Sequence, residues 1–340
     1  MIRSVNGDVN EEGFGRPVPP GGYAWWYFDA LSDDGTRAFA AIFFIGSVFS
    51  PSYARRVRRG EPARAEEHLG VNVALYERGK QAAWVMSEYG ARELKSASAS
   101  ELRIAGSGIV RSPSGAIRLE IVEHSAPFLS SLVRVGARVV GHVEIEPLSP
   151  SLAGNELASV DGHRHGWRVP VPRARFTVEM ERPAFRFQGT GYHDTNYGDG
   201  RLEAAFSRWS WARFHTGDRT VILYETRDRR GVERAMLVDA RDGDVASQRA
   251  THEVAAAIDG PLRRAGWGLQ LPAWFTLKDG SLRCEPRQFL ETAPFYARYV
   301  GALQENGKPL ATGMGEYLDL DRFSGRGIQF LLRFKTRKVS

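Results

Sequence analysis

Turn-forming residues recur at short intervals along the 340-residue chain, and this spacing limits what the chain can fold into. Between the turns lie short runs rich in Val, Ile, Phe, Tyr and Trp, the residues that strands prefer. Residues 221–224 form a continuous apolar run, whereas residues 117–121 alternate apolar and polar as a half-buried strand does. The pattern predicts mostly antiparallel strands. The turns fall at residues 32–35, 77–80, 112–115, 216–218, 230–231, 242–243, 279–280 and 306–307.

Helical signals are sparse, because only residues 251–258 and 92–96 offer short helical candidates. We therefore predict an all-β fold of the sandwich or barrel class with few short helices, rather than alternating strands and helices. No glycine-rich nucleotide-binding pattern lies between a predicted strand and a predicted helix. A nucleotide cofactor is accordingly not expected.

The chain is longer than the roughly 250 to 300 residues at which one hydrophobic core stops growing. With 42% hydrophobic residues, it predicts two β domains, residues 1–188 and 189–340. A weak internal repeat supports this division. Trp25 and Trp209 each lie in a predicted strand that leads through a tight turn into an apolar strand. The Tyr192 and Asp194 segment would then lie near the domain junction, where binding sites are common.

A single cysteine, Cys284, excludes an intrachain disulfide and favours a reducing compartment. The first eight residues lack the apolar stretch of a signal peptide, so we expect a cytoplasmic protein. The longest apolar run, residues 39–49, is about half of the roughly 20 residues that a membrane-spanning helix needs. We expect it to form a buried strand.

The net charge of +6 includes a dense group of arginines at residues 55–59. Solvated arginines explain such a group, and so does contact with the anionic headgroups of a membrane. Both interpretations stay open at this point. No nucleic-acid partner is expected, and the sequence does not predict the number of subunits.

Two short segments contain the side chains best suited to chemistry. In extended chain, residues two apart share a face, which pairs Tyr192 with Asp194 and His165 with Trp167. One acid and one imidazole among electron-rich rings suit protonation of a carbon–carbon double bond, and therefore carbocation chemistry. The alternative is structural: Asp194 would lie in an Asx turn, and His165 would be a buried histidine whose ring nitrogens have hydrogen-bond partners.

The catalytic hypothesis makes a demand on each titratable group. To hold its proton at neutral pH, Asp194 needs a pKa raised from about 3.9 to about 7, which burial beneath aromatic rings can supply. His165 would relay a proton or accept one from the attacking water. It has to be neutral, because an imidazolium beside Asp194 would lower the pKa of the aspartate.

A metal site is the competing interpretation of the histidines. His163 and His165 form a His-x-His pair, with Asp161 before them and His193 further along. However, Asp161 and Gly162 resemble a turn that breaks the strand phase, and His193 is expected to face away from Asp194. We therefore expect no metal.

The aromatic residues are dense in two regions of the chain. They either pack as core or line an elongated apolar tunnel, where their π faces would each stabilise a cation by about 2 kcal/mol. The sequence leaves both possibilities open. The proposed substrate-binding residues are Trp25, Trp26, Tyr27, Trp209 and Trp211.

Six ordered blocks, which together span most of the chain, resemble the acyclic carotenoid 1,2-hydratases, also called hydroxyneurosporene synthases. The resemblance implies tandem lipocalin-like domains and a cofactor-free hydro-lyase. Its substrates would be acyclic carotenes such as neurosporene or lycopene, which gain a tertiary 1-hydroxyl group. The blocks are residues 17–35, 46–51, 72–76, 191–196, 208–211 and 293–298.

The same resemblance implies roles for four residues. Asp194 would protonate the terminal double bond, Trp167 and Tyr192 would shield the cation, and His165 would position the water. Because carotenes dissolve in bilayers, it also implies peripheral contact with a membrane. Two rival functions stay open: a lipocalin-like carrier of polyenes or lipids, and a cofactor-free isomerase or cyclase, since some members of the wider group resemble pericyclases.

Overall fold

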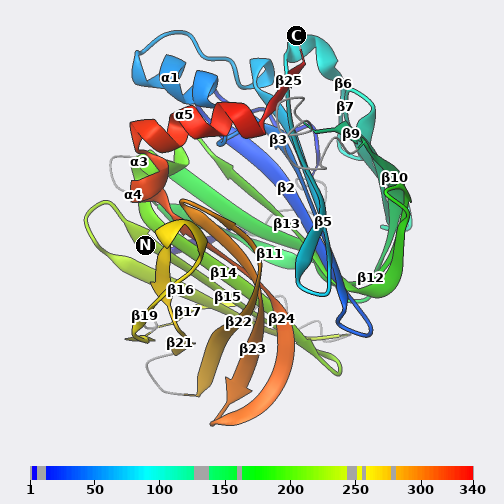
Figure 1. Ribbon diagram of the computed structural model, residues 1–340, viewed down its shortest axis with the longest axis vertical. Helices are drawn as coiled ribbons and strands as arrows, with labels where there is room; N and C mark the ends of the chain where they lie inside the picture. Colours follow the sequence, from blue (N-terminus) through cyan, green and yellow to red (C-terminus); the bar gives the residue numbers. More distant parts are fainter. Residues whose placement is uncertain are drawn as a thin grey trace.

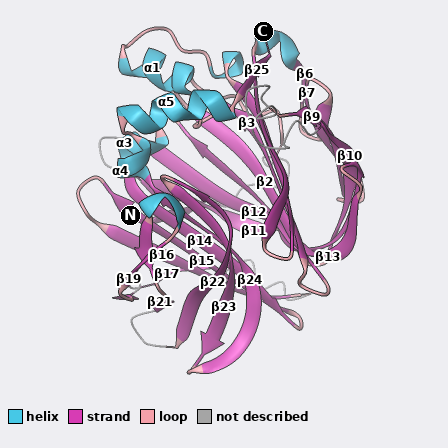
Figure 2. Ribbon diagram, in the orientation of Figure 1, coloured by secondary structure: helices cyan, strands magenta, loops and turns pink. Residues whose placement is uncertain are grey.

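Two curled, mainly antiparallel sheets make up most of the described chain (Figure 1). The computed structural model describes residues 2–5, 13–125, 138–158, 163–242, 251–254, 258–276 and 281–339. Strands predominate and the helices are short, which confirms the all-β prediction (Figure 2). The helices are α1 (Pro51–Arg58), α3 (Leu202–Ala205), α4 (Leu320–Phe323) and α5 (Arg326–Lys335), with 3-10 turns η2 (Ala65–Glu67), η3 (Ala91–Glu93) and η6 (Gly266–Gly268).

The first sheet contains 14 strands among the described residues, and almost all of them come from the N-terminal part of the chain. Strand β11 (Leu152–Ala158) also pairs with β12, and β1 (Ile2–Val5) pairs with β11. The order of the remaining strands is β25 (Arg337–Val339), β5 (Lys80–Tyr89), β4 (Leu69–Glu77), β3 (Arg37–Ile45), β2 (Tyr23–Ser32), β13 (Phe185–Gly198), β12 (Arg164–Arg182), β10 (Arg138–Pro147), β9 (Ile117–His124), β8 (Ser107–Arg111), β7 (Glu101–Ile104) and β6 (Leu94–Ala97).

The second sheet contains nine strands among the described residues. A separate small pair is formed by β19 (Leu262–Arg264) and β20 (Gln270–Pro272). The order of the second sheet is β17 (Thr251–Val254), β16 (Glu233–Arg241), β15 (Arg219–Asp228), β14 (Phe206–Thr216), β24 (Lys308–Asp319), β23 (Tyr296–Glu305), β22 (Leu282–Ala293), β21 (Phe275–Thr276) and β18 (Ile258–Asp259).

Both helical candidates need correction. Residues 251–254 form strand β17, which pairs with β16 at the edge of the second sheet. Residues 92–96 contain only the end of the single turn η3 and then enter strand β6. The helix α1 begins instead at Pro51, where the Ser50 side chain accepts a hydrogen bond from the backbone of Tyr53 and proline occupies the first turn.

Strands β2 and β3 are buried on both faces, which explains their nearly continuous apolar sequences. Trp26 and Phe28 point into the interior of the first sheet, where they join its core. Trp25 and Tyr27 alternate with them and point toward the second sheet. The prediction of a buried strand within residues 39–49 is confirmed by β3, which ends at Ile45.

The first sheet curls far enough for β5 to meet β9. The carboxylate of Glu123 on β9 is buried and accepts hydrogen bonds from Ser87 and Tyr89 of β5 and from Ser107 of β8. Burial raises the pKa of Glu123. These three hydroxyl donors satisfy a polar group that would otherwise be costly inside an apolar interior.

The two hairpins predicted from the weak internal repeat are present, as β2 with β3 and as β14 with β15. The expected domain boundary at 188–189 falls inside β13, which continues in the first sheet to Gly198. The chain changes sheet between Gly198 and Phe206, through the short helix α3. The division into two domains stays a prediction.

The outer face of the first sheet packs on the second sheet through an aromatic layer and a buried ion pair. Arg213 of β14 donates to Asp29 of β2 with its Nε at 2.7 Å from Oδ1, and the two side chains are 2% and 0% exposed. Tyr27 donates to the other oxygen of Asp29 at 3.0 Å. Because burying two charges is costly, each side chain depends on the other for compensation.

The C-terminal segment returns from the second sheet to the first. Helix α5 packs beside α1, and β25 then pairs parallel with β5 at the edge of the first sheet (Figure 1). No helix among the described residues is long and apolar enough to span a membrane.

We expect that Asp29→Ala will lower the free energy of unfolding by about 3–5 kcal/mol, because it leaves the Arg213 guanidinium buried without its counter-charge. Urea unfolding followed by tryptophan fluorescence measures the change. The control is Glu77→Ala, which removes a half-exposed ion pair with Arg37 and should cost at most about 1 kcal/mol. Equal effects of the two substitutions would contradict the importance of the buried pair.

Candidate active site

Strand register brings the two predicted segments together on the face of the first sheet that meets the second sheet. On β12 and β13, Trp167 lies opposite Asn196 and His165 lies opposite Gly198. On β13 and β2, Asp194 lies opposite Tyr27. Directly opposed residues of antiparallel strands share a face, so these side chains form one group.

Asp194 is the centre of this group and is 3% exposed. Its Oδ2 accepts hydrogen bonds from the Trp167 indole at 3.0 Å and the Tyr192 hydroxyl at 2.9 Å. Its Oδ1 accepts one from the Asn196 amide at 3.1 Å. Burial raises the pKa of the Asp194 carboxyl group to about 8, against the opposing effect of the bonds from Trp167 and Tyr192. The carboxyl group is therefore neutral at pH 7.

The hydrogen bonds also assign the position of its proton. Each carboxyl oxygen has two lone pairs, and both on Oδ2 are used by the donors Trp167 and Tyr192. Oδ1 receives only Asn196, which leaves one lone pair for the acidic proton. Since Asp194 lines the cavity described below, Oδ1 is the atom from which it can donate.

His165 lies between two tyrosines and makes no contact with Asp194. Its Nδ1 is 2.7 Å from the Tyr23 hydroxyl and its Nε2 is 2.6 Å from the Tyr224 hydroxyl. Tyr224 donates to the amide oxygen of Asn196, so Nε2 must carry the proton and Nδ1 must accept from Tyr23. Burial lowers the pKa of His165 to about 3, and the ring is neutral.

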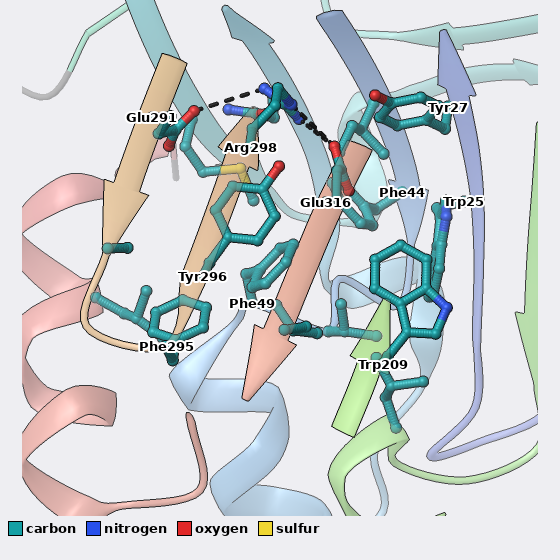
Figure 3. A pocket seen from close by; sticks show the side chains of 18 of the residues that line it. Trp25, Tyr27, Phe44, Phe49, Trp209, Glu291, Phe295, Tyr296, Arg298 and Glu316 are labelled. Carbon is teal, nitrogen blue, oxygen red and sulfur yellow. Dashed lines mark hydrogen bonds and ion pairs between the residues drawn. The ribbon is translucent and has the colours of Figure 1, made fainter. Parts of the chain in front are cut away.

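A cavity of about 300 Å³ lies between the two sheets, and Asp194 forms part of its wall. Figure 3 shows other side chains of this wall, among them Trp25, Tyr296 and Arg298. Most of its other walls are aromatic or aliphatic, from both sheets and from α5. This composition suits an apolar ligand. The lining includes Trp25, Tyr27, Phe44, Phe49, Trp84, Met86, Trp209, Trp211, Phe295, Tyr296, Leu318, Ile328 and Leu332, with the polar residues Asn72, Asn196, Glu291, Arg298 and Glu316.

Four of the five predicted substrate-binding residues line this cavity: Trp25, Tyr27, Trp209 and Trp211. Trp26 does not, because strand alternation turns it into the first core, where its ring meets Phe14 edge-on at 5.9 Å. Trp26 therefore lies outside this cavity, and substrate binding by the other four residues stays a prediction.

The remaining predicted residues lie behind Asp194 rather than in the cavity wall. Tyr192 packs on Trp211 with ring centroids 5.0 Å apart, and Trp167 stacks on Tyr224 at 4.6 Å. On the opposite face of β12, Gly166 makes room for Tyr197, since a Cβ there would lie 2.1 Å from the Tyr197 ring. The contacts of Trp167 and Tyr192 are therefore with the acid, which they hold in place.

The histidines considered as metal ligands point to different places. His163 Nδ1 is 3.8 Å from Asp199 near the surface, whereas His193 stacks on Phe28 at 4.1 Å. His165 is engaged by its two tyrosines. Asp161 lies outside the described residues. Within the described ranges, no three His, Cys, Asp or Glu side chains converge on one point.

Several residues of the site were missed from the sequence. Asn196 follows Asp194 by two positions, so strand phase already indicated it. Arg298 lies in the block at 293–298 that carries the family resemblance, and strand phase pairs it with Tyr296. Tyr224 and Glu316 carry no local signal, because only the packing of the second sheet on the first brings them to the site.

Comparisons with known proteins agree with this architecture. Residues 41–339 match the family model described as carotenoid hydratase CrtC. An acyclic carotenoid 1,2-hydratase of Thiocapsa roseopersicina is 34% identical over 333 residues, 96% of this chain and 75% of that protein. One from Rubrivivax gelatinosus is 33% identical over 299 residues, 84% of this chain and 66% of that protein.

A solved structure shares the fold at low sequence identity. An AttH protein from Nitrosomonas europaea superposes with a TM-score of 0.62 and 14% identity, over 94% of this chain and 97% of that protein. This likeness supports a lipocalin-like β fold and nothing about the reaction. From the match over residues 41–339 and the identity to two relatives, the chain belongs to the carotenoid hydratase CrtC family.

Proposed function

We propose that this protein is a carotenoid 1,2-hydratase that adds water to the terminal double bond of an acyclic carotene such as neurosporene or lycopene. The observation that carries the proposal is Asp194, a carboxyl group held neutral by burial in the wall of an aromatic cavity. The two relatives, both acyclic carotenoid 1,2-hydratases, support the same reaction. The product would be a tertiary 1-hydroxy carotenoid.

The first step transfers the proton of Asp194 to the second carbon of the chain end, which leaves a tertiary cation on the first carbon. An unactivated alkene has no polar group to bind, so the cavity has to position it by shape and apolar contact. The rings of Trp25, Tyr27, Trp209 and Trp211 face the cavity, and their π electrons stabilise the cation by about 2 kcal/mol each where water is excluded.

The second step adds water to the cation and releases a proton. The carboxylate formed on Asp194 is held by the Trp167 indole, the Tyr192 hydroxyl and the Asn196 amide, all of which already donate to it. Such preorganised donors lower the cost of the charge as it develops. The sum of the two steps is alkene plus water giving alcohol, and it consumes no cofactor.

We also propose that the cavity mouth contacts a membrane, the phase in which carotenes dissolve. Two residues that line the cavity are also widely exposed, Trp267 of η6 at 65% and Leu331 of α5 at 49%. Helix α1 beside α5 carries the exposed arginines Arg55 and Arg58. Apolar side chains at the mouth and nearby positive charge suit an anionic bilayer surface.

Asp194→Asn should abolish hydration while keeping carotene binding. Loss of a general acid costs about 10²- to 10⁴-fold in turnover, whereas the amide keeps the shape of the side chain. Turnover is measured from the mass of the pigments, and binding from the carotene absorption spectrum. Unchanged turnover in this variant would remove Asp194 from the acid role. Carotene binding without hydration by the wild type would instead favour a carrier, and an isomerised or cyclised product of the wild type would favour the isomerase or cyclase.

Activity should persist at neutral pH and fall as the pH rises through about 8. Folding raises the pKa of Asp194 above its ordinary value, so the folded protein keeps the proton until that pH. The stabilisation from this proton is fully present below the ordinary pKa of about 3.8, declines as the pH rises above it and is lost by about pH 8. The initial rate of hydration against pH measures the effect, and infrared difference spectra report the protonated carboxyl group. An activity that falls only below pH 5 would contradict the acid role.

Replacing Trp267 and Leu331 together by serine should weaken binding to vesicles that contain anionic lipid. The loss of buried apolar area reduces partitioning at about 25 cal/mol per Å². Vesicle flotation measures binding, and circular dichroism checks folding. Leu148→Ser is the control, since Leu148 is 47% exposed but does not line the cavity. Equal binding of the double variant and the wild type would refute the proposed surface.

A further inference from the structure

A buried charged cluster forms the part of the cavity wall contributed by the second sheet. Arg298 of β23 is 1% exposed and lies between two glutamates (Figure 3). It contacts Glu316 of β24 at 2.9 Å and Glu291 of β22 at 3.5 Å. Tyr76 from the first sheet donates to Glu291 at 2.6 Å and accepts from Arg298 at 2.8 Å. Two carboxylates thus share one guanidinium beside an apolar cavity.

The two oxygens of Glu316 have different surroundings. Both contacts with Arg298, from Nε and from Nη2, go to Oε1 at 2.9 Å. Neither of these contacts uses Oε2. Since Glu316 lines the cavity, Oε2 can accept a hydrogen bond from a molecule inside it.

The hydroxyl group of Tyr296 is a second polar group at this place. Within the described part of the chain it is buried and makes no hydrogen bond. In Figure 3 it points toward Arg298 and Glu316. Buried polar groups in native proteins almost always have a partner, so this hydroxyl indicates a small polar ligand in the cavity.

His165 is poorly placed to hold such a ligand. Its two nitrogens are both occupied, by Tyr23 and by Tyr224, and it does not line the cavity. Water positioning by His165, implied by the family resemblance, would require one of these bonds to break. Glu316 and Tyr296 need no such change.

We propose that Glu316 and Tyr296 bind the attacking water and that Glu316 is the base that takes its proton. This inference rests on the proposed hydration. The water oxygen forms its bond to the cationic carbon, and one of its hydrogens passes to Oε2 of Glu316. The protonated alcohol that forms first is a strong acid, so even a carboxylate held by Arg298 can remove its proton. Return of this proton to Asp194 through cavity water restores both groups.

The arrangement places acid and base on different sheets. Asp194 donates from the first sheet, and Glu316 lies on the second, opposite Trp211 in the register of β14 and β24. The Trp211 ring also contacts Tyr27 and Tyr192, at 5.3 and 5.0 Å. Besides burial, the negative charge of Glu316 helps to raise the pKa of Asp194. The base therefore also favours retention of the proton on the acid.

Glu316→Gln and Tyr296→Phe separate protonation from water capture when the reaction is run in D₂O. We expect hydration to fall about 10²-fold in Glu316→Gln and several-fold in Tyr296→Phe. Asp194 still delivers deuterium, and a cation that is not captured loses a proton and returns to alkene. The ratio of deuterium in the recovered carotene to the amount of alcohol formed should therefore be higher in both variants than in the wild type. Mass spectrometry of both pigments gives this ratio.

Two controls make the outcome decisive. Asp194→Asn should lose hydration and exchange together, and Tyr299→Phe, on the opposite face of β23, should change neither. Tyr296→Phe removes a hydroxyl without a partner among the described residues, so its thermal stability should match the wild type. A parallel fall of exchange and hydration in the two variants, or no fall, would overturn the inference. Absence of hydration by the wild type would refute the proposed function instead.

Discussion

Desolvation of one carboxyl group is the constraint on which the site depends. Neither sheet alone excludes water from Asp194, because its donors stand on the outer face of the first sheet and the second sheet supplies the cover. The same packing neutralises His165 and buries Arg213 beside Asp29. The contact of two apolar faces is therefore the single cause of three properties: the raised pKa of Asp194, the aromatic lining of the cavity and the stability of the contact between the sheets.

Strand alternation accounts for most of what the sequence predicted at the site. The two-residue spacing predicts that Tyr192 and Asp194 share a face of their strand, and the turn pattern predicts the hairpin of β2 and β3. Alternation also explains why Trp26 does not line the cavity. In a strand buried on both faces, hydrophobicity does not distinguish the core face from the cavity face, so Trp25 and Trp26 look equivalent until the neighbouring sheet is known.

The contacts between the two sheets could not be predicted from the sequence, for a physical reason. Tyr224 meets His165 and Arg298 meets Tyr76 only because two curled surfaces match, and no local periodicity encodes that fit. Helix positions failed for a related reason. The candidate at residues 251–258 includes three consecutive alanines, which favour a helix, but its residues 251–254 complete a ladder with β16. Helix α1 instead depends on one serine cap and a proline.

Strand β25 has a consequence for how the chain assembles. Residues 337–339 supply the outermost strand of a sheet whose other members lie before residue 199, so a ribosome must synthesise the whole second sheet before that edge is covered. Until then β5 presents unpaired amides and carbonyls that invite pairing with another chain. Truncating the last turn of α5 and β25 would therefore favour aggregation during synthesis even if the catalytic groups stayed intact.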